Sequence, residues 1–181
     1  MKIYCDMDGV LADLTGGIKK TSKNSLNSEL IIELLSMDFS WRKTHPDPLL
    51  NSALDELKFM IGENSEFWAN LDMMPDAHVL WDYISQFDVD VLSHPWDDDS
   101  AEGKEFWVCN NLEPRPNKIY LPLDGNKHLW ATQPDGTPNI LIDDFEKYIT
   151  KWTSAGGIAI THTSAEKTIL DLKKILNGDN K

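Results

Sequence analysis

The sequence predicts an α/β fold, a three-layer sandwich in which a mostly parallel five-stranded sheet lies between layers of helices. Five short apolar runs recur along the 181 residues, and most are separated by segments with helical periodicity. This alternation favours right-handed crossovers, which place neighbouring strands parallel to one another. Several runs also end in acidic or hydroxyl residues, as expected where a parallel sheet gathers functional groups at the carboxyl ends of its strands.

The first apolar run ends in Asp6 and Asp8, which are one residue apart and are followed by Gly9. In an extended strand, both acids project to the same face. Neighbouring carboxylates repel each other, so their ionised forms need a cation, and Mg2+ satisfies several oxygens at once. An ordinary acidic turn at a strand end is the structural alternative. A calcium-binding EF-hand loop is excluded, because Val10 and Gly17 occupy the positions of its fifth and twelfth residues.

A helical insert is predicted for residues 14–74. It begins with residues 14–18, which we expect to be a flexible exit from the first strand. Two stripes of leucine and isoleucine at helical spacing follow, and Gly62 is a natural end for the second. An irregular loop with two prolines and several aromatic residues separates them. The two stripes and the loop cover residues 30–35, 50–61 and 38–48.

From residue 75 onward, helical and strand patterns alternate again. Pro95 stops the next strand, because proline cannot donate to a strand ladder. Thr163 and Glu166 form a predicted capping box for the last helix, and Gly178 is its predicted end. The predicted strands cover residues 89–93, 118–121, 139–144 and 158–161, and the predicted helical segments cover 75–87, 97–109, 126–131, 145–155 and 165–176.

The segment Asp6-Met7-Asp8-Gly9-Val10-Leu11-Ala12-Asp13 resembles the first motif of the haloacid dehalogenase-like phosphohydrolases. Its continuation from Gly9 is similar to the 5'(3')-deoxyribonucleotidase branch, and residues 67–77 resemble the return from cap to core in that branch. The resemblance implies a Rossmann-like catalytic core, residues 1–13 and 75–181, with residues 14–74 as a small helical cap inserted after the first strand.

The same resemblance implies a Mg2+-dependent phosphomonoesterase that hydrolyses nucleoside monophosphates, deoxyribonucleotides in particular, through an aspartyl-phosphate. Asp6 would be the nucleophile, while Asp8 would protonate the leaving oxygen and then activate water. The implied ligands of Mg2+ are the Asp6 carboxylate, the Asp8 main-chain carbonyl and the Asp144 carboxylate. Asp143 would act through a water molecule or a hydrogen bond.

The family's second and third motifs are assigned by position. Ser93 ends a predicted strand, and its hydroxyl would donate to the phosphate, although serine also commonly begins turns. Lys127 is our choice for the cation of the third motif, because it begins a short helix before the acid pair. Its competitors are Lys104, Arg115 and Lys118.

Aromatic side chains in the insert could bind the substrate. Trp41, Phe67 and Trp68 could stack on a nucleobase, or they could simply close the small core of the insert. His94 stands where deoxyribonucleotidases usually have a small hydroxyl residue, which leaves the phosphate or sugar contacts open. We assign it to the substrate site.

Composition limits the partners. The net charge of -13 and the pI near 4.6 argue against a nucleic-acid polymer, so we expect a small phosphorylated substrate. The sequence shows no membrane-spanning run and no leader, so a soluble cytoplasmic protein is expected, with Cys5 and Cys109 reduced. A homodimer is left open. Alternatives are a phosphatase for another small phosphoester, such as a sugar phosphate, and a non-catalytic protein that binds a phospholigand.

Overall fold

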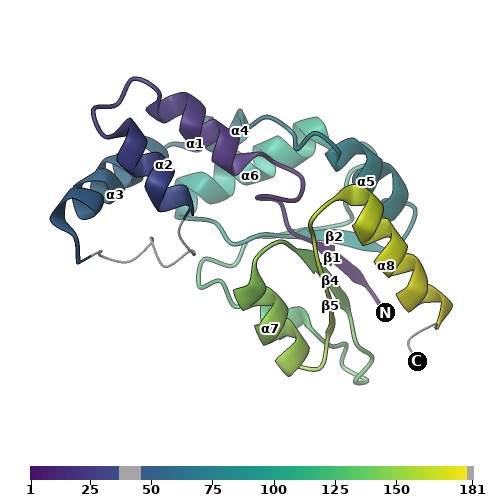
Figure 1. Cartoon of the computed structure of the whole chain (residues 1–181). Coiled ribbons are helices and arrows are strands. Elements are labelled where there is room, and N and C mark those ends of the chain that lie inside the picture. The colour runs from purple at the N-terminus through teal and green to yellow at the C-terminus, as the bar shows by residue number, and fades with distance from the viewer. Residues whose placement is uncertain (37–45, 179–181) are drawn as a thin grey trace.

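The computed structural model describes residues 1–36 and 46–178 and shows a five-stranded sheet flanked by helices (Figure 1). The strand order is β3-β2-β1-β4-β5, and every neighbouring pair is parallel. The strands are β1 (Ile3–Cys5), β2 (Val89–Leu92), β3 (Ile119–Tyr120), β4 (Ile140–Asp143) and β5 (Ile158–Thr161). The predicted fold class is therefore confirmed.

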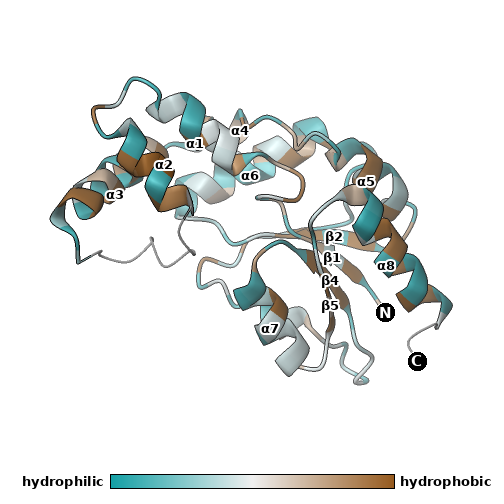
Figure 2. Ribbon diagram, in the orientation of Figure 1, coloured by the Kyte–Doolittle hydropathy of each residue, from teal (hydrophilic) through white to brown (hydrophobic). Residues whose placement is uncertain are grey.

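The central strands are buried on both faces, as their apolar sequences require (Figure 2). Alternate residues of these strands contribute to two hydrophobic clusters. One cluster joins the sheet to α5, α6 and α8, and the other joins it to α7 and the short 3-10 helix η2. These helices are α5 (Ala77–Ile84), α6 (Asp98–Asn111), η2 (Lys127–Trp130), α7 (Glu146–Ser154) and α8 (Ala165–Asn177).

Four helices lie between β1 and α5 in the described part of the sequence. They are α1 (Leu14–Ser22), α2 (Ser28–Ser36), α3 (Pro48–Ile61) and α4 (Ser65–Ala69). The chain leaves and re-enters the sheet domain side by side, because the Asp13 amide donates to the Asp72 carbonyl and the Met74 amide donates to the Leu11 carbonyl, both at 2.8 Å. Figure 1 shows α1, α2 and α3 grouped beyond the end of the sheet. The division into a core and a cap at these points stays a prediction.

The flexible exit predicted for residues 14–18 is wrong, because this segment is the first turn of α1. The Asp13 carboxylate caps the helix and accepts a hydrogen bond of 2.7 Å from the Gly16 amide. A Cβ on Gly17 would overlap the Leu71 side chain, so this glycine permits close packing. The local sequence did not reveal this packing, because Leu71 lies far from Gly17 in the chain.

The ends of the last helix were predicted with mixed success. The N-cap of α8 is Ser164, which accepts from the Lys167 amide, so the capping box predicted for Thr163 and Glu166 is one residue out of place. Gly178 does end α8, with a φ of 75°. Within the described ranges, no helix combines the length and the apolar character needed to cross a membrane.

Candidate active site

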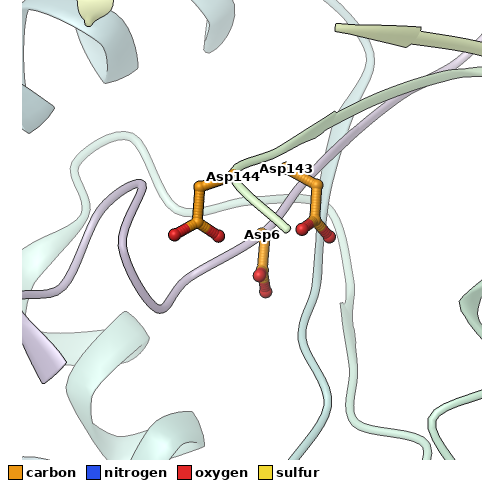
Figure 3. A group of neighbouring side chains, drawn as sticks. All are labelled: Asp6, Asp143 and Asp144. Atoms are coloured by element: carbon orange, nitrogen blue, oxygen red, sulfur yellow. The ribbon is translucent and has the colours of Figure 1, made fainter. Parts of the chain in front are cut away.

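Three aspartates meet where β1 and β4 end. Asp6 follows β1, Asp143 is the last residue of β4, and Asp144 comes next. The two strands are neighbours with Cys5 opposite Ile142, and the Asp6 amide donates to the Ile142 carbonyl at 2.9 Å. Each aspartate offers a carboxylate oxygen, and these oxygens all lie within 4.8 Å of one another (Figure 3). Strand register therefore assembles this cluster from distant parts of the sequence.

The turn after β1 brings the chain close to Asp144. Gly9 has a φ of 74°, and a Cβ at this position would overlap the Asp144 carboxylate. The amides of Leu11 and Ala12 both donate to the Met7 carbonyl at 2.8 Å, which closes the turn. A residue without a side chain is needed here for two reasons, backbone conformation and space.

Lys127 lies between two of the acids. It is 1% exposed, and its Nζ lies 2.9 Å from Asp6 Oδ1 and 2.6 Å from Asp143 Oδ2. Burial alone would lower the pKa of Lys127, but the charges of Asp6 and Asp143 outweigh it and raise this pKa above its ordinary value. Lys127 is therefore a fixed positive charge beside the predicted nucleophile.

A second buried lysine, Lys104 of α6, contacts the remaining acid. Its Nζ lies 2.5 Å from Asp8 Oδ2 and 3.1 Å from Ser93 Oγ, and the residue is fully buried. The sequence analysis treated Lys104 only as a competitor of Lys127, whereas the structure brings both to the site. A signal was present, because Lys104 lies in the stripe of α6 that includes Trp107 and Val108.

The two acids at the end of β4 resist ionisation. Burial raises the pKa of Asp143 to about 7, and the charge of Asp6 adds to this effect. The charge of Lys127 opposes it. Asp144 is exposed as a whole residue, yet nearby chain atoms partly desolvate its carboxyl group. This desolvation and the charges of Asp6 and Asp143 raise its pKa to about 7. A divalent cation among these oxygens would relieve the repulsion.

The donor set fits a hard cation. All three clustered ligand groups are carboxylates, which suit Mg2+. Both oxygens of Asp143 already accept hydrogen bonds, Oδ1 from the Phe145 amide and Oδ2 from Lys127. This leaves Asp6 and Asp144 better placed than Asp143 to bind an ion directly.

Asp6, Asp144 and Lys127 line a cavity of about 80 Å³. Its volume is far below the roughly 300–1,000 Å³ of typical ligand pockets, so most of a nucleotide would lie beyond it. Leu14 and Thr15 of α1 reach this cavity from the inserted helices. The remaining lining residues are Asp8, Gly9, Ser93, His94, Phe145, Lys147 and Tyr148.

His94 is held in the cavity wall by two polar contacts. Its Nε2 lies 3.2 Å from the Leu123 carbonyl and its Nδ1 lies 2.7 Å from the Tyr148 hydroxyl. Because a carbonyl only accepts, Nε2 is the donor in the contact with Leu123. The Tyr148 ring also lies 4.4 Å from Lys127 Nζ. The sequence analysis missed Tyr148, because its spacing on α7 is that of an ordinary core residue.

The predicted base-stacking role of Trp68 needs correction. Trp68 is fully buried, its Nε1 donates to the Ile61 carbonyl at 2.8 Å, and Lys104 Nζ lies 4.9 Å from its ring centroid. Phe67 packs edge-on against it and is partly buried. Packing inside the molecule, the alternative interpretation of these aromatics, is what the structure shows for Trp68. Trp41 lies outside the described residues.

The other competitors for the third motif lie away from the acids. Lys118 directly precedes β3, at the amino end of the sheet, and its amide donates to buried Asp90. Arg115 lies in the same connection before β3. The site is at the opposite, carboxyl edge of the strands.

Neither the family models nor the curated protein sequences contain a match to this chain. Solved structures do match. An L-2-haloacid dehalogenase from Xanthobacter autotrophicus is 15% identical with a TM-score of 0.59, over 98% of this chain and 82% of that one. The magnesium-bound putative HAD-hydrolase YfnB from Bacillus subtilis is 14% identical with a TM-score of 0.59, over 97% and 98% of the two chains.

A HAD-family enzyme from Bacteroides thetaiotaomicron, in complex with magnesium and inorganic phosphate, is 19% identical with a TM-score of 0.50, over 90% of this chain and 94% of that one. At these identities, the likeness concerns the fold. The chain has the Rossmann-like fold of the haloacid dehalogenase superfamily of hydrolases.

Proposed function

We propose that the protein is a Mg2+-dependent phosphomonoesterase that acts through an aspartyl-phosphate, with nucleoside monophosphates, deoxyribonucleotides in particular, as substrates. The observation that carries the proposal is the arrangement of charges at the end of the sheet. The oxygens of Asp6, Asp143 and Asp144 lie within 4.8 Å of one another, and buried lysines contact Asp6 and Asp8. This arrangement suits a dianionic phosphoryl group and a divalent cation.

Asp6 is oriented for nucleophilic attack. Its Oδ1 accepts a 2.7 Å hydrogen bond from the Met7 amide and pairs with Lys127. These two contacts fix the carboxylate, and one of its oxygens is the nucleophile. It forms a bond to phosphorus as the bond from phosphorus to the leaving oxygen breaks, and Asp8 donates a proton to that oxygen. Water then attacks the phosphorus, Asp8 takes a proton from it, and the Asp6 carboxylate and inorganic phosphate are released.

Other groups of the chain hold the phosphoryl oxygens. Ser93 Oγ accepts from Lys104, so its own hydrogen is directed to a phosphoryl oxygen. Mg2+ would be held by the carboxylates of Asp6 and Asp144 and the main-chain carbonyl of Asp8, where it would neutralise phosphoryl charge. Asp143 acts as a support, because it fixes Lys127.

The presence of Asp8 favours phosphoester hydrolysis over dehalogenation, although several of the similar structures are dehalogenases. A halide leaves as a stable anion and needs no proton, whereas an alcohol leaving from a phosphoester does. Asp8 lines the cavity close to the acid cluster, where it can supply that proton.

The test is phosphate release from a panel of deoxynucleoside monophosphates, sugar phosphates and 2-haloacids. We expect turnover of the nucleotides that EDTA and Asp6→Asn both abolish. Asp82→Asn, a change of an exposed acid on α5, is the matched control and should retain activity. Activity that persists in Asp6→Asn protein would reject the mechanism, and halide release without phosphate release would reject the function.

The small cavity specifically favours a second candidate, a phosphatase for a compact ester such as a sugar phosphate. A volume of about 80 Å³ holds the reacting group but encloses little of a nucleoside. If nucleotides are the poorest substrates in the panel, this candidate replaces the first. Saturable binding of a phosphorylated ligand without turnover would instead identify a binding protein.

A further inference from the structure

The two buried lysines of the site contact different acids. Lys127 contacts the nucleophile Asp6, while Lys104 contacts Asp8, the acid assigned to proton transfer. Lys104 is fully buried, and its Nζ donates to Asp8 and to Ser93. A buried ammonium group tied to one carboxylate at 2.5 Å fixes the orientation of that carboxylate.

The two oxygens of Asp8 have different surroundings. Oδ2 accepts from Lys104 Nζ, whereas Oδ1 is buried and has no hydrogen-bond partner among the described residues. Asp8 also lines the cavity that contains Asp6 and Ser93. A buried oxygen without a partner is costly unless a ligand supplies one. A substrate in the cavity can supply that partner.

We propose that Lys104 is a positioning residue that holds Asp8 by Oδ2, so that Oδ1 is the oxygen that transfers the proton to the leaving group. This inference rests on the proposed phosphomonoesterase function and adds a residue to it. Asp8 Oδ1 gives its proton to the leaving oxygen of the substrate as the bond between this leaving oxygen and phosphorus breaks. Lys104 makes no bond and transfers no proton in this step.

Helix α4 from the inserted segment protects this contact. The Trp68 ring lies 4.9 Å from Lys104 Nζ, and a Cβ on Gly103 would come within 2.7 Å of the Trp68 Cβ. Gly103 thus lets α4 lie directly on α6. The Lys104 side of the ion pair is therefore fully buried, which strengthens its hold on Asp8.

The leaving group of the substrate provides the test. An alkyl phosphate needs a proton on its departing oxygen, whereas 4-nitrophenolate is stable enough to leave without one. We expect Lys104→Met to lower kcat/KM for the best alkyl monophosphate by about 100-fold and for 4-nitrophenyl phosphate by no more than about threefold. Lys151→Met, at an exposed position of α7, is the matched control and should change neither value.

A double-mutant cycle separates action through Asp8 from other roles. If Lys104 acts only through Asp8, adding Lys104→Met to Asp8→Asn should lower kcat/KM for the alkyl ester by no more than about threefold. The double variant removes both charges of the buried pair, so it avoids an unpaired buried charge. The comparison therefore remains decisive where Lys104→Met alone does not fold.

Each result decides the matter. Equal losses for the two esters in Lys104→Met protein, or independent losses in the cycle, would show that Lys104 acts on the phosphoryl group and would overturn the inference. The proposed function would survive that outcome. If the wild-type chain hydrolyses neither of the two esters, both the inference about Lys104 and the proposed function are overturned.

Discussion

Lys127 and Lys104 show how single residues divide the work of a charged site. Lys127 pairs with Asp6 and Asp143, so it acts on the nucleophile and on its neighbour at the end of β4. Lys104 pairs with Asp8, two residues after the nucleophile. Because the two lysines contact different acids, their removal should have different kinetic consequences.

Lys127→Met is expected to slow the hydrolysis of every phosphoester. Loss of this charge removes electrostatic stabilisation from Asp6 and from the phosphoryl group, which should lower kcat/KM by roughly 100- to 1,000-fold. The loss should be similar for alkyl and 4-nitrophenyl phosphates, in contrast to Lys104→Met. Steady-state kinetics with both esters measures it, and Lys118→Met at the amino end of the sheet is the control. A loss confined to alkyl esters would contradict this role.

Gly9 allows a second prediction at the residue scale. A side chain here meets two obstacles, a φ of 74° and the Asp144 carboxylate. Gly136 has a φ of 84°, but a Cβ there would have no described atom within 4 Å, so this position isolates the backbone effect. Both Gly9→Ala and Gly136→Ala should lose about 1–3 kcal/mol of unfolding free energy from backbone strain.

Only Gly9→Ala should also raise the Mg2+ concentration needed for half-maximal activity, because the added methyl group displaces Asp144. Metal titrations of both variants, with urea unfolding of each, separate the two effects. An unchanged Mg2+ requirement in Gly9→Ala protein would show that Asp144 is not a ligand.

At the scale of elements, local pattern sufficed for the strands and for most helices, because apolar periodicity is a property of neighbouring residues. It also sufficed to predict that Asp6, Ser93 and Asp143 lie at one edge of the sheet, since the carboxyl ends of parallel strands share that edge. It failed where packing against a distant element decides. Gly17 packs closely against Leu71 and Trp68 is buried beside α6, and no local pattern contains these contacts.

The packing of α4 on α6 can be tested through Trp68. Trp68→Ala removes a fully buried ring and should lower the free energy of unfolding by about 3–5 kcal/mol. Phe59→Ala is the matched control, because Phe59 of α3 is 87% exposed, and it should change stability by no more than about 0.5 kcal/mol. Urea unfolding measures both. If Trp68 stacked on a base instead, its removal would raise KM and leave stability unchanged.

At the scale of the whole molecule, the site gathers charges from segments spread over most of the chain. If all its groups are ionised, four carboxylates and two ammonium groups leave two negative charges, which one divalent cation balances. These groups are Asp6, Asp8, Asp143, Asp144, Lys104 and Lys127. Charge balance therefore links metal binding to the stability of the entire fold.

This link predicts how stability depends on pH. Asp143 and Asp144 have pKa values of about 7 in the fold, well above the ordinary value of 3.8. The fold therefore binds more protons than the unfolded chain between about pH 4 and 7, and stability without metal should fall as pH rises through this window. Burial lowers the pKa of His162. Protonation of His162 therefore destabilises the fold as pH falls, which opposes the effect of the two acids.

Comparison with Asp144→Asn isolates the carboxyl contribution, since His162 contributes equally to both proteins. Between about pH 5.5 and pH 8, metal-free wild-type protein should lose more thermal stability than Asp144→Asn protein. Excess MgCl2 should raise the unfolding temperature of the wild type more at the higher pH, because ion binding there displaces fewer protons. Differential scanning calorimetry at both pH values, with and without MgCl2, measures these shifts. An equal response of the two proteins to pH, or a Mg2+ shift independent of pH, would mean that Asp144 does not couple ion binding to folding.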